Sequence, residues 1–482
     1  MFSFWKKKGS KAPQDGTIGG DTSAGRSTTQ LRLDAIEEAV ENYRQMASES
    51  PDSPEIQCNY GVALAQAGRF EDARMALSRA IVLRADFSEA IFALGYVYEL
   101  EGKIEHAVEH YRKAIAIRPD FFDAIVQLGR AHLVEAEYEE AEKYLLKAAG
   151  VREDDSKVQR LLGNTYQKMG RITSAEEHYR KAVELDKSDF AAHYDFGCLL
   201  KNVGDFERAE TEFRRCLTLA PWFVPAQNNL GLTLHYLGKD PQALMVFSEL
   251  TSDNPDYAEG HNNFGKVYYH MGNLDEAEAE IRRAIAINDA IGGAWHNLAK
   301  ILLRRGLADE AAAACGRSLE LDPGNPEAQY DLAMMHISSG RYEEAAASLE
   351  RALVYNPSMT HARRKLAELY LDMGLAARAT EHLQRVLKEE ADDSGALYNL
   401  GIAHYQGGKT REALDIFSQV LETEPSHPYA WTNAGLCLER IGRTDEAVRF
   451  YRRAIEVSPH EPWTQKAREA LKRLGESEEN IA

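Results

Sequence analysis

The chain has 482 residues, of which 44% are hydrophobic and 28% charged, a composition that suits a packed fold and excludes bulk disorder. Its formal net charge is −19, and an acidic surface repels phosphate backbones, so we do not expect nucleic acid as a general partner. The five cysteines show neither the paired spacing of a metal site nor a disulfide framework, which favours a reducing, cytoplasmic compartment.

Residues 1–29 differ from the rest of the chain in composition. Phe2, Phe4 and Trp5 lie beside four lysines, and residues 12–29 are rich in Gly, Ser and Thr, which predicts a flexible tether. The aromatic and basic mixture permits weak peripheral contact with an anionic membrane, and an unstructured tail with incidental aromatics explains it equally well. No apolar run is long enough for a signal peptide or a transmembrane helix.

Residues 30–53 have the pattern of a second repeat helix without its first, which predicts an N-terminal capping helix. From residue 54 to 461 the chain then repeats every 34 residues, twelve times. One column is glycine or alanine in every repeat, and the residue twelve positions later is always alanine. The first members of these two columns are Gly61 and Ala73, Gly95 and Ala107, and Gly129 and Ala141.

These columns predict two antiparallel helices per repeat, joined by a short turn. Glycine inside a helix costs about 1 kcal/mol relative to alanine, so we expect the first column to permit close packing, with the alanine column facing it. A third column, from Gly68 to Gly442, is glycine except at Ala136, and predicts a left-handed end to each first helix. Residues 462–482 predict a C-terminal capping helix and a short tail, with Arg468 and Glu469 at positions that are apolar in the repeats.

The columns resemble those of the tetratricopeptide repeat family, with small residues at two contact positions, a bulky residue such as Tyr111 or Phe213, and a terminal proline. The resemblance implies an all-α, right-handed superhelical solenoid of tandem helix-turn-helix repeats. It also implies a concave wall of first helices that binds extended peptides or helices of partner proteins.

One column of that predicted wall is rich in asparagine. Side-chain amides can bond a peptide backbone without reading its sequence, and in this respect the chain is similar to the repeat superhelix of O-linked N-acetylglucosamine transferases. The alternative is that these amides bond neighbouring helices or water. The candidate peptide-binding residues are Asn229, Asn263, Asn297, Asn399 and Asn433.

Basic residues cluster on the same wall in the middle repeats. An acidic segment or a C-terminal carboxylate of a partner would suit them, and a mixed solvated surface remains the alternative because Asp195 and Asp331 share the wall. The candidates are Lys201, Lys266, Lys300 and Arg304. The carboxylate clamp of heat-shock cochaperones needs a column set that no three successive repeats supply.

Two short motifs imitate catalytic signatures. Residues 403–410 match a loose phosphate-loop pattern through Lys409 and Thr410, but they end a predicted helix and follow no strand. His106, Glu109 and His110 match an inverted zinc-protease pattern on a predicted helix that offers no further ligand. We therefore expect no catalytic residue, no metal and no cofactor.

The sequence thus favours a noncatalytic scaffold that binds segments or helices of partner proteins and assembles complexes. Two alternatives stay open. One is a substrate-recruiting subunit for a separately encoded transferase, and the other is an assembly factor tethered to a membrane.

Overall fold

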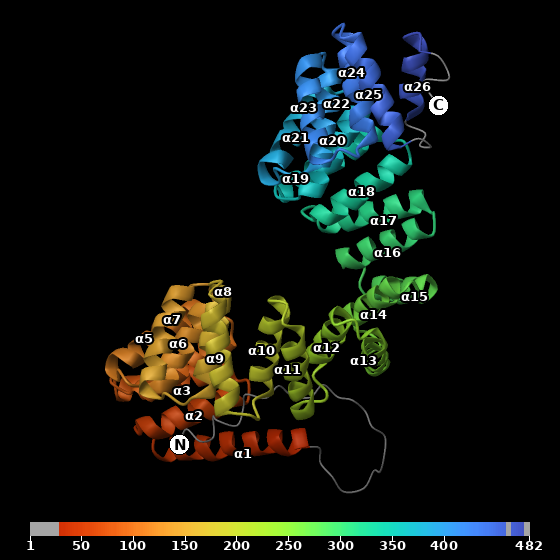
Figure 1. The fold of residues 1–482 in the computed structure, drawn as a ribbon. Helices are drawn as coiled ribbons and strands as arrows, with labels where there is room; N and C mark the ends of the chain where they lie inside the picture. The colour runs from red at the N-terminus through yellow and green to blue at the C-terminus, as the bar shows by residue number, and fades with distance from the viewer. Residues whose placement is uncertain (1–27, 459–463, 477–482) are drawn as a thin grey trace. The chain divides into compact units, whose positions relative to one another are not determined.

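A computed structural model describes residues 28–458 and 464–476, so the predicted tail and its aromatic and basic residues lie outside the described part (Figure 1). The described residues are helices joined by short turns, and they divide into two compact units on either side of the Phe223–Val224 bond. None of the helices described is long and apolar enough to cross a membrane.

In residues 28–223, the described part of the first unit, there are eleven helices: α1 (Thr28–Glu49), α2 (Pro54–Gln66), α3 (Phe70–Leu83), α4 (Ser88–Leu100), α5 (Ile104–Ile117), α6 (Phe122–Val134), α7 (Tyr138–Val151), α8 (Ser156–Lys168), α9 (Ile172–Leu185), α10 (Phe190–Asn202) and α11 (Phe206–Leu219). From α2 onward, each even-numbered helix is the first of a repeat and packs against the odd-numbered helix that follows it. α1 packs against α2, the position predicted for the N-terminal cap.

The described part of the second unit contains α12 (Val224–Tyr236), α13 (Asp240–Asp253), α14 (Ala258–Met271), α15 (Leu274–Ile287), α16 (Gly292–Arg304), α17 (Ala308–Leu321), α18 (Pro326–Ser338), α19 (Tyr342–Tyr355), α20 (Thr360–Asp372), α21 (Ala376–Glu389), α22 (Ser394–Gln406), α23 (Thr410–Thr423), α24 (Pro428–Arg440), α25 (Thr444–Val457) and α26 (Thr464–Arg473). The last helix packs on α24 and α25, buries Ala467, Ala470 and Leu471, and leaves Glu469 exposed.

The turn inside each repeat has the predicted backbone. All third-column glycines have positive φ, from 70° at Gly238 to 85° at Gly204, and Ala136 adopts the same conformation at 58°. A left-handed residue lets the N–H groups after it bond the last carbonyls of the first helix. Lys409 N, for example, bonds His404 O at 2.8 Å after Gly408.

The packing inside each repeat corrects one expectation. All twelve second-column alanines are fully buried, and the backbone oxygens of Ala73 and Ala277 lie near Gly61 and Gly265, but the atoms nearest most of the glycines belong to a larger side chain. A Cβ on Gly163 would lie 2.6 Å from the ring of Tyr179, and one on Gly197 would lie 2.8 Å from Phe213. Each glycine of the first column therefore makes room for a large side chain sixteen residues later, which is a ring in six repeats: Tyr111, Tyr179, Phe213, Phe247, Phe417 and Tyr451.

Within each unit, most first helices also contact the first helix of the next repeat, as α12 does with α14 and α14 with α16. The second helices make no comparable contacts with each other in the described residues. Because helices on the inner side of a curved stack are the more crowded, the first helices line the concave side of each unit. We call the exposed face of α12, α14, α16, α18, α20, α22 and α24 the inner wall of the second unit.

Candidate functional site

The asparagines predicted to form a ladder lie on first helices, half-buried, and several are bonded to the neighbouring helix. Asn263 Nδ2 donates to Asn228 Oδ1 at 2.9 Å, and Asn297 Nδ2 donates to Asn262 Oδ1 at 2.9 Å. Asn433 Nδ2 donates to the Tyr398 hydroxyl at 2.8 Å. Each bond joins residues 35 apart, so these three amides tie α14, α16 and α24 each to the first helix before it.

The same tie is made by other residue types elsewhere. His296 bonds Asp331 at 2.8 Å between α16 and α18, and Arg160 bonds Asp195 at 2.9 Å between α8 and α10. Since an amide has two N–H groups, a bond to the neighbouring helix uses one and leaves the other for a further partner. Asn229 and Asn399 lie half-buried at the equivalent positions of α12 and α22.

The basic residues of α14 and α16 form a cluster with tyrosine rings on the inner wall. Lys266 lies 5.4 Å from the centre of the Tyr236 ring, and its Nζ is 3.3 Å from the Tyr236 hydroxyl. Arg304 lies 4.1 Å over the Tyr269 ring and donates to Tyr269 O at 3.2 Å, and Lys300 lies 5.9 Å from the same ring. We call these five residues the cation–tyrosine cluster.

None of the three cations has a carboxylate within ion-pair distance among the described residues, whereas Asp331 and Glu368, two acidic residues on the first helices of the second unit, are paired. Asp331 bonds His296, and Glu368 bonds Lys365 at 3.0 Å. The cluster is therefore a place where positive charge is held by aromatic faces and left without a counter-charge.

The positive charge of this cluster affects the pKa of the neighbouring residue His270. Its ring lies 5.0 Å from that of His235. Partial burial lowers the pKa of His270, and the charges of His235, Lys266, Lys300 and Arg304 lower the pKa further. The positive charges that disfavour protonation of His270 would also attract an anion to this surface.

The fourth predicted basic residue, Lys201, lies half-buried on α10 in the first unit, at the repeat position that Tyr269 occupies in α14. Lys201 is therefore not among the five residues of the cation–tyrosine cluster. Sequence reasoning singled out the cations and missed the rings, although Tyr269 and Arg304 show the same 35-residue spacing as the asparagine pairs.

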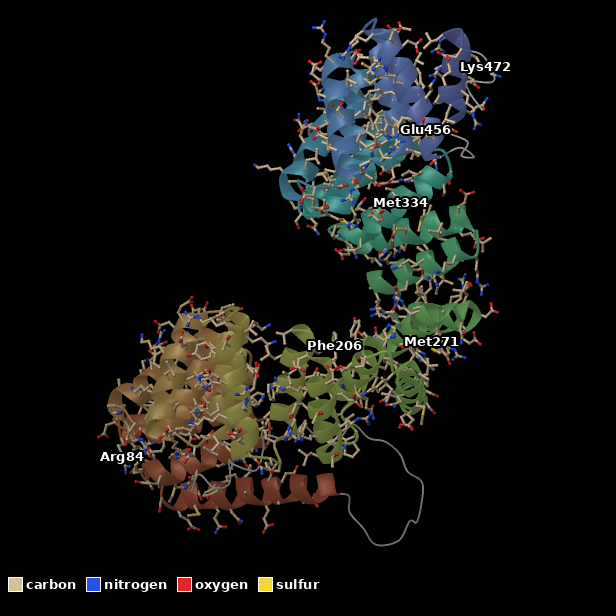
Figure 2. The ribbon with its side chains drawn as sticks, in the orientation of Figure 1. Arg84, Phe206, Met271, Met334, Glu456 and Lys472 are labelled. Carbon is tan, nitrogen blue, oxygen red and sulfur yellow. The ribbon has the colours of Figure 1, made fainter. Side chains whose placement is uncertain are left out.

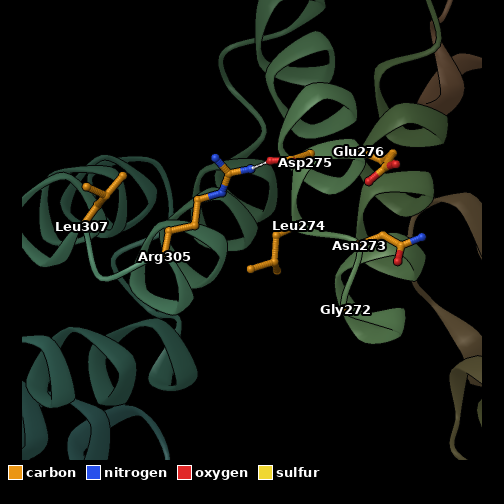
Figure 3. Close-up of a pocket in the computed structure, with 7 residues that line it drawn as sticks. All are labelled: Gly272, Asn273, Leu274, Asp275, Glu276, Arg305 and Leu307. Carbon is orange, nitrogen blue, oxygen red and sulfur yellow. Dashed lines mark hydrogen bonds and ion pairs between the residues drawn. The ribbon is translucent and has the colours of Figure 1, made fainter.

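A hollow at the turn between α14 and α15 is open and internally paired. Figure 3 shows Arg305 reaching Asp275 across it, and Arg305 Nη1 also lies 3.2 Å from Glu278 Oε2. Its lining includes Gly272, Leu274 and Leu307, and its one arginine, Arg305, is already paired with carboxylates. This hollow offers a ligand much less than the inner wall does.

The two catalytic-looking motifs lie in ordinary repeat positions. The rings of His106 and His110 each lie 5.2 Å from Tyr98, so they pack against the first helix of their own repeat. Lys409 and Thr410 follow the left-handed Gly408 at the turn between α22 and α23.

Comparison with known protein families identifies one kind of repeat along most of the chain. Family models described as tetratricopeptide repeat match residues 31–94, 99–164, 161–189, 190–221, 228–291, 262–326, 302–353, 336–400 and 398–462. No curated protein sequence matches the chain.

Several solved structures are similar in fold. The APC/C hetero-tetramer Cut9–Hcn1 has 14% identity and a TM-score of 0.40, over 93% of this chain and 95% of that chain. The Thermus thermophilus protein TTC0263 has 25% identity and a TM-score of 0.35, over 38% and 99%. The human IFIT1 dimer with m7Gppp-AAAA has 15% identity and a TM-score of 0.44, over 77% and 90%.

The matched repeats cover most of the sequence, and the described helices pair as such repeats do. The chain therefore belongs to the tetratricopeptide repeat family, whose members are in general noncatalytic protein–protein interaction scaffolds.

Proposed function

We propose that the chain is a scaffold that holds extended segments of partner proteins along the inner wall of the second unit, and that the cation–tyrosine cluster takes an acidic stretch of the segment. The observation that carries this proposal is the set of Lys266, Lys300 and Arg304, which stack on tyrosines and have no carboxylate partner among the described residues. In a chain with a net charge of −19, such a concentration of unpaired positive charge favours an anionic ligand.

The arrangement of the cation–tyrosine cluster supports binding of an acidic segment in two ways. Stacking on Tyr236 and Tyr269 restricts the cations before a ligand arrives, so less side-chain freedom is lost on binding. Bonds between a cation and a carboxylate are about twice as strong as neutral ones. A segment with alternating acidic residues would meet the cations of α14 and then those of α16.

The ladder asparagines suit the backbone of such a segment. Asn263 and Asn297 each keep a second N–H group beyond the one bonded to the neighbouring helix. Replacing Asn229, Asn263 and Asn297 together with alanine would test this role. The substitution would also remove the single feature that favours a substrate-recruiting subunit for a transferase.

The test uses a fluorescent peptide, Ser-Glu-Ser-Glu-Ser-Glu-Ser-Glu, and the full chain, with binding followed by anisotropy. We expect Lys300→Gln with Arg304→Gln to weaken binding about tenfold, because two solvent-exposed ion pairs worth about 0.7 kcal/mol each are lost. The matched control is Arg351→Gln with Lys388→Gln, which removes the same charge from exposed positions of α19 and α21. Equal losses in the two variants would leave only a long-range charge effect and overturn the proposal.

None of the five cysteines forms a disulfide, which suits a reducing compartment, and we propose the cytoplasm as the location of the scaffold on that basis. Assembly of complexes follows if segments of two partners bind at once. Crosslinking followed by identification of two partners in one particle would establish that step.

A further inference from the structure

The cation–tyrosine cluster has an equivalent four repeats later, on α22 and α24. Tyr405 and Arg440 repeat the pair of Tyr269 and Arg304: Arg440 lies 5.1 Å over the Tyr405 ring, and its Nη1 is 3.5 Å from Tyr405 O. The two lysine positions, however, are changed. Ile402 stands where α14 has Lys266, and Leu436 stands where α16 has Lys300.

Ile402 and Leu436, the two apolar residues at these lysine positions, line a pocket of about 470 Å³. Its lining includes Tyr398, Ile402, Tyr405, Phe417, Tyr429 and Leu436. Phe417 is fully buried, while Tyr429 is 39% exposed. An apolar, aromatic pocket of this volume is large enough for a bulky side chain and the backbone beside it.

The aromatic side of the pocket is held in place before any ligand binds. Asn433 Nδ2 donates to the Tyr398 hydroxyl, and the His427 ring lies 4.7 Å from the Tyr398 ring. Burial raises the pKa of Tyr398 to about 12, with the Asn433 bond acting in the opposite direction, so the phenol keeps its proton. That proton can be donated to a carbonyl of the bound segment.

The charges beside the pocket select against a cationic occupant. Lys466 lines it, and Arg440 stacks on the Tyr405 ring that lines it. Neither cation has a carboxylate partner within the part of the chain that the structure describes. Charge complementarity therefore favours an occupant that carries a carboxylate next to its apolar side chain.

We propose that this pocket anchors a phenylalanine, leucine or methionine of an extended partner segment, flanked by an acidic residue that meets Arg440 or Lys466. The inference rests on the proposed function, because the same wall must hold the segment. It adds that the wall has two equivalently built sites of different chemistry, one for acidic side chains on α14 and α16 and one for an apolar side chain on α22 and α24.

The experiment compares two fluorescent peptides on the full chain. One is Ser-Glu-Ser-Glu-Ser-Glu-Ser-Glu, and the other has phenylalanine in place of its third serine. We expect the phenylalanine peptide to bind about tenfold more tightly, as burial of one aromatic side chain predicts. Equal affinity of the two peptides would overturn the proposal.

The decisive variant is Ile402→Lys with Leu436→Lys, which installs the residues that α14 and α16 carry at the equivalent positions. Such residues fit this backbone elsewhere in the chain, and a circular dichroism melt checks the fold. We expect the advantage of the phenylalanine peptide to disappear while the serine peptide still binds. Tyr429→Ser, at an exposed position, should reduce the same advantage, and survival of the advantage in both variants would overturn the pocket assignment.

The outcomes separate this inference from the proposed function. Loss of serine-peptide binding in the Lys300→Gln and Arg304→Gln variant supports the first site whatever the pocket does. If a proline-rich peptide without acidic residues bound as tightly as the phenylalanine peptide, the pocket would belong to another occupant. If the chain self-associated and Ile402→Lys with Leu436→Lys abolished that association, the occupant would be a second copy of the chain. Either result would overturn the inference.

Discussion

The ring of Phe247 occupies the space that a side chain on Gly231 would need. A Cβ on that glycine would lie 2.6 Å from both Cε2 and Cζ of the ring. The first helix therefore gives up helix propensity so that the second helix can place a large aromatic residue against its backbone.

We predict that Gly231→Ala lowers the free energy of unfolding by about 1–2 kcal/mol, since overpacking costs more than the gain in helix propensity. Adding Phe247→Leu should recover much of the loss, because Ala333 and Ala367 already occur with Leu349 and Leu383 at the equivalent position. Thermal melts and hydrogen exchange in α12 and α13 would measure both effects.

The control for that pair is Gly293→Ala on α16, where an added Cβ meets nothing within 4 Å. This change should leave the melting temperature unchanged or raise it. A melting temperature that falls as far as that of Gly231→Ala would contradict the packing explanation.

Ala136 is the one described residue other than glycine with positive φ, at 58°. We predict that Ala136→Gly stabilises the turn between α6 and α7 by about 1 kcal/mol, because a left-handed L-residue costs about that much. Slower amide exchange after α6 would show it. Gly170→Ala is the reverse test: nothing lies within 4 Å of an added Cβ, so any loss of stability comes from the backbone alone.

Binding of the acidic peptide should strengthen as the pH falls from 7.5 to 5.5. Burial, His235, Lys266, Lys300 and Arg304 all lower the pKa of His270, and carboxylates bound beside it would favour its protonated form, so binding takes up a proton and is favoured by acid. The glutamates of the peptide stay ionised over this range. Anisotropy titrations at the two pH values would show a several-fold gain.

The stability of the folded chain without ligand should fall as the pH falls, whereas the affinity for the peptide should rise. Because the pKa of His270 is lower in the folded state, its contribution to stability is present at neutral pH and is lost as the pH falls. His270→Gln should shrink the acid gain in binding. His382→Gln, which removes a histidine of lowered pKa from α21, should leave that gain intact, and equal effects would disprove the assignment.

The thiols should be inert in the folded protein. Burial raises the pKa of Cys58, Cys216, Cys315 and Cys437 to about 12, and that of Cys198 to about 11. Little thiolate then exists at pH 8, so Ellman's reagent should react slowly with the native chain and with five thiols after denaturation. Rapid reaction of any one thiol in the native chain would contradict its burial.

The sequence predicts the helix pairs well because single columns carry the signals for them. Glycine at positions such as Gly408 reports the left-handed turn, and the invariant alanine column reports full burial. The packing partner of the first glycine column could not be assigned this way, because sixteen residues separate Gly231 from Phe247 and both alanine and the ring lie on the same second helix.

The candidate sites were harder to predict because each depends on two neighbouring first helices. A single column shows Asn263, but its partner Asn228 occupies the preceding column of the previous repeat. The pocket likewise needs Tyr405 of one helix and Leu436 of the next. Only a comparison of residues 35 apart, rather than 34, would have brought such pairs together.

The equal step of the repeats has a consequence for the partner. Within the second unit, the lysine positions of α14 and α16 and their apolar counterparts on α22 and α24 are set apart by a fixed number of helix pairs. A segment that used both would need its acidic run and its hydrophobic residue at a matching separation. The wall would then act as a ruler, reading the distance between two features of a ligand as well as the features themselves.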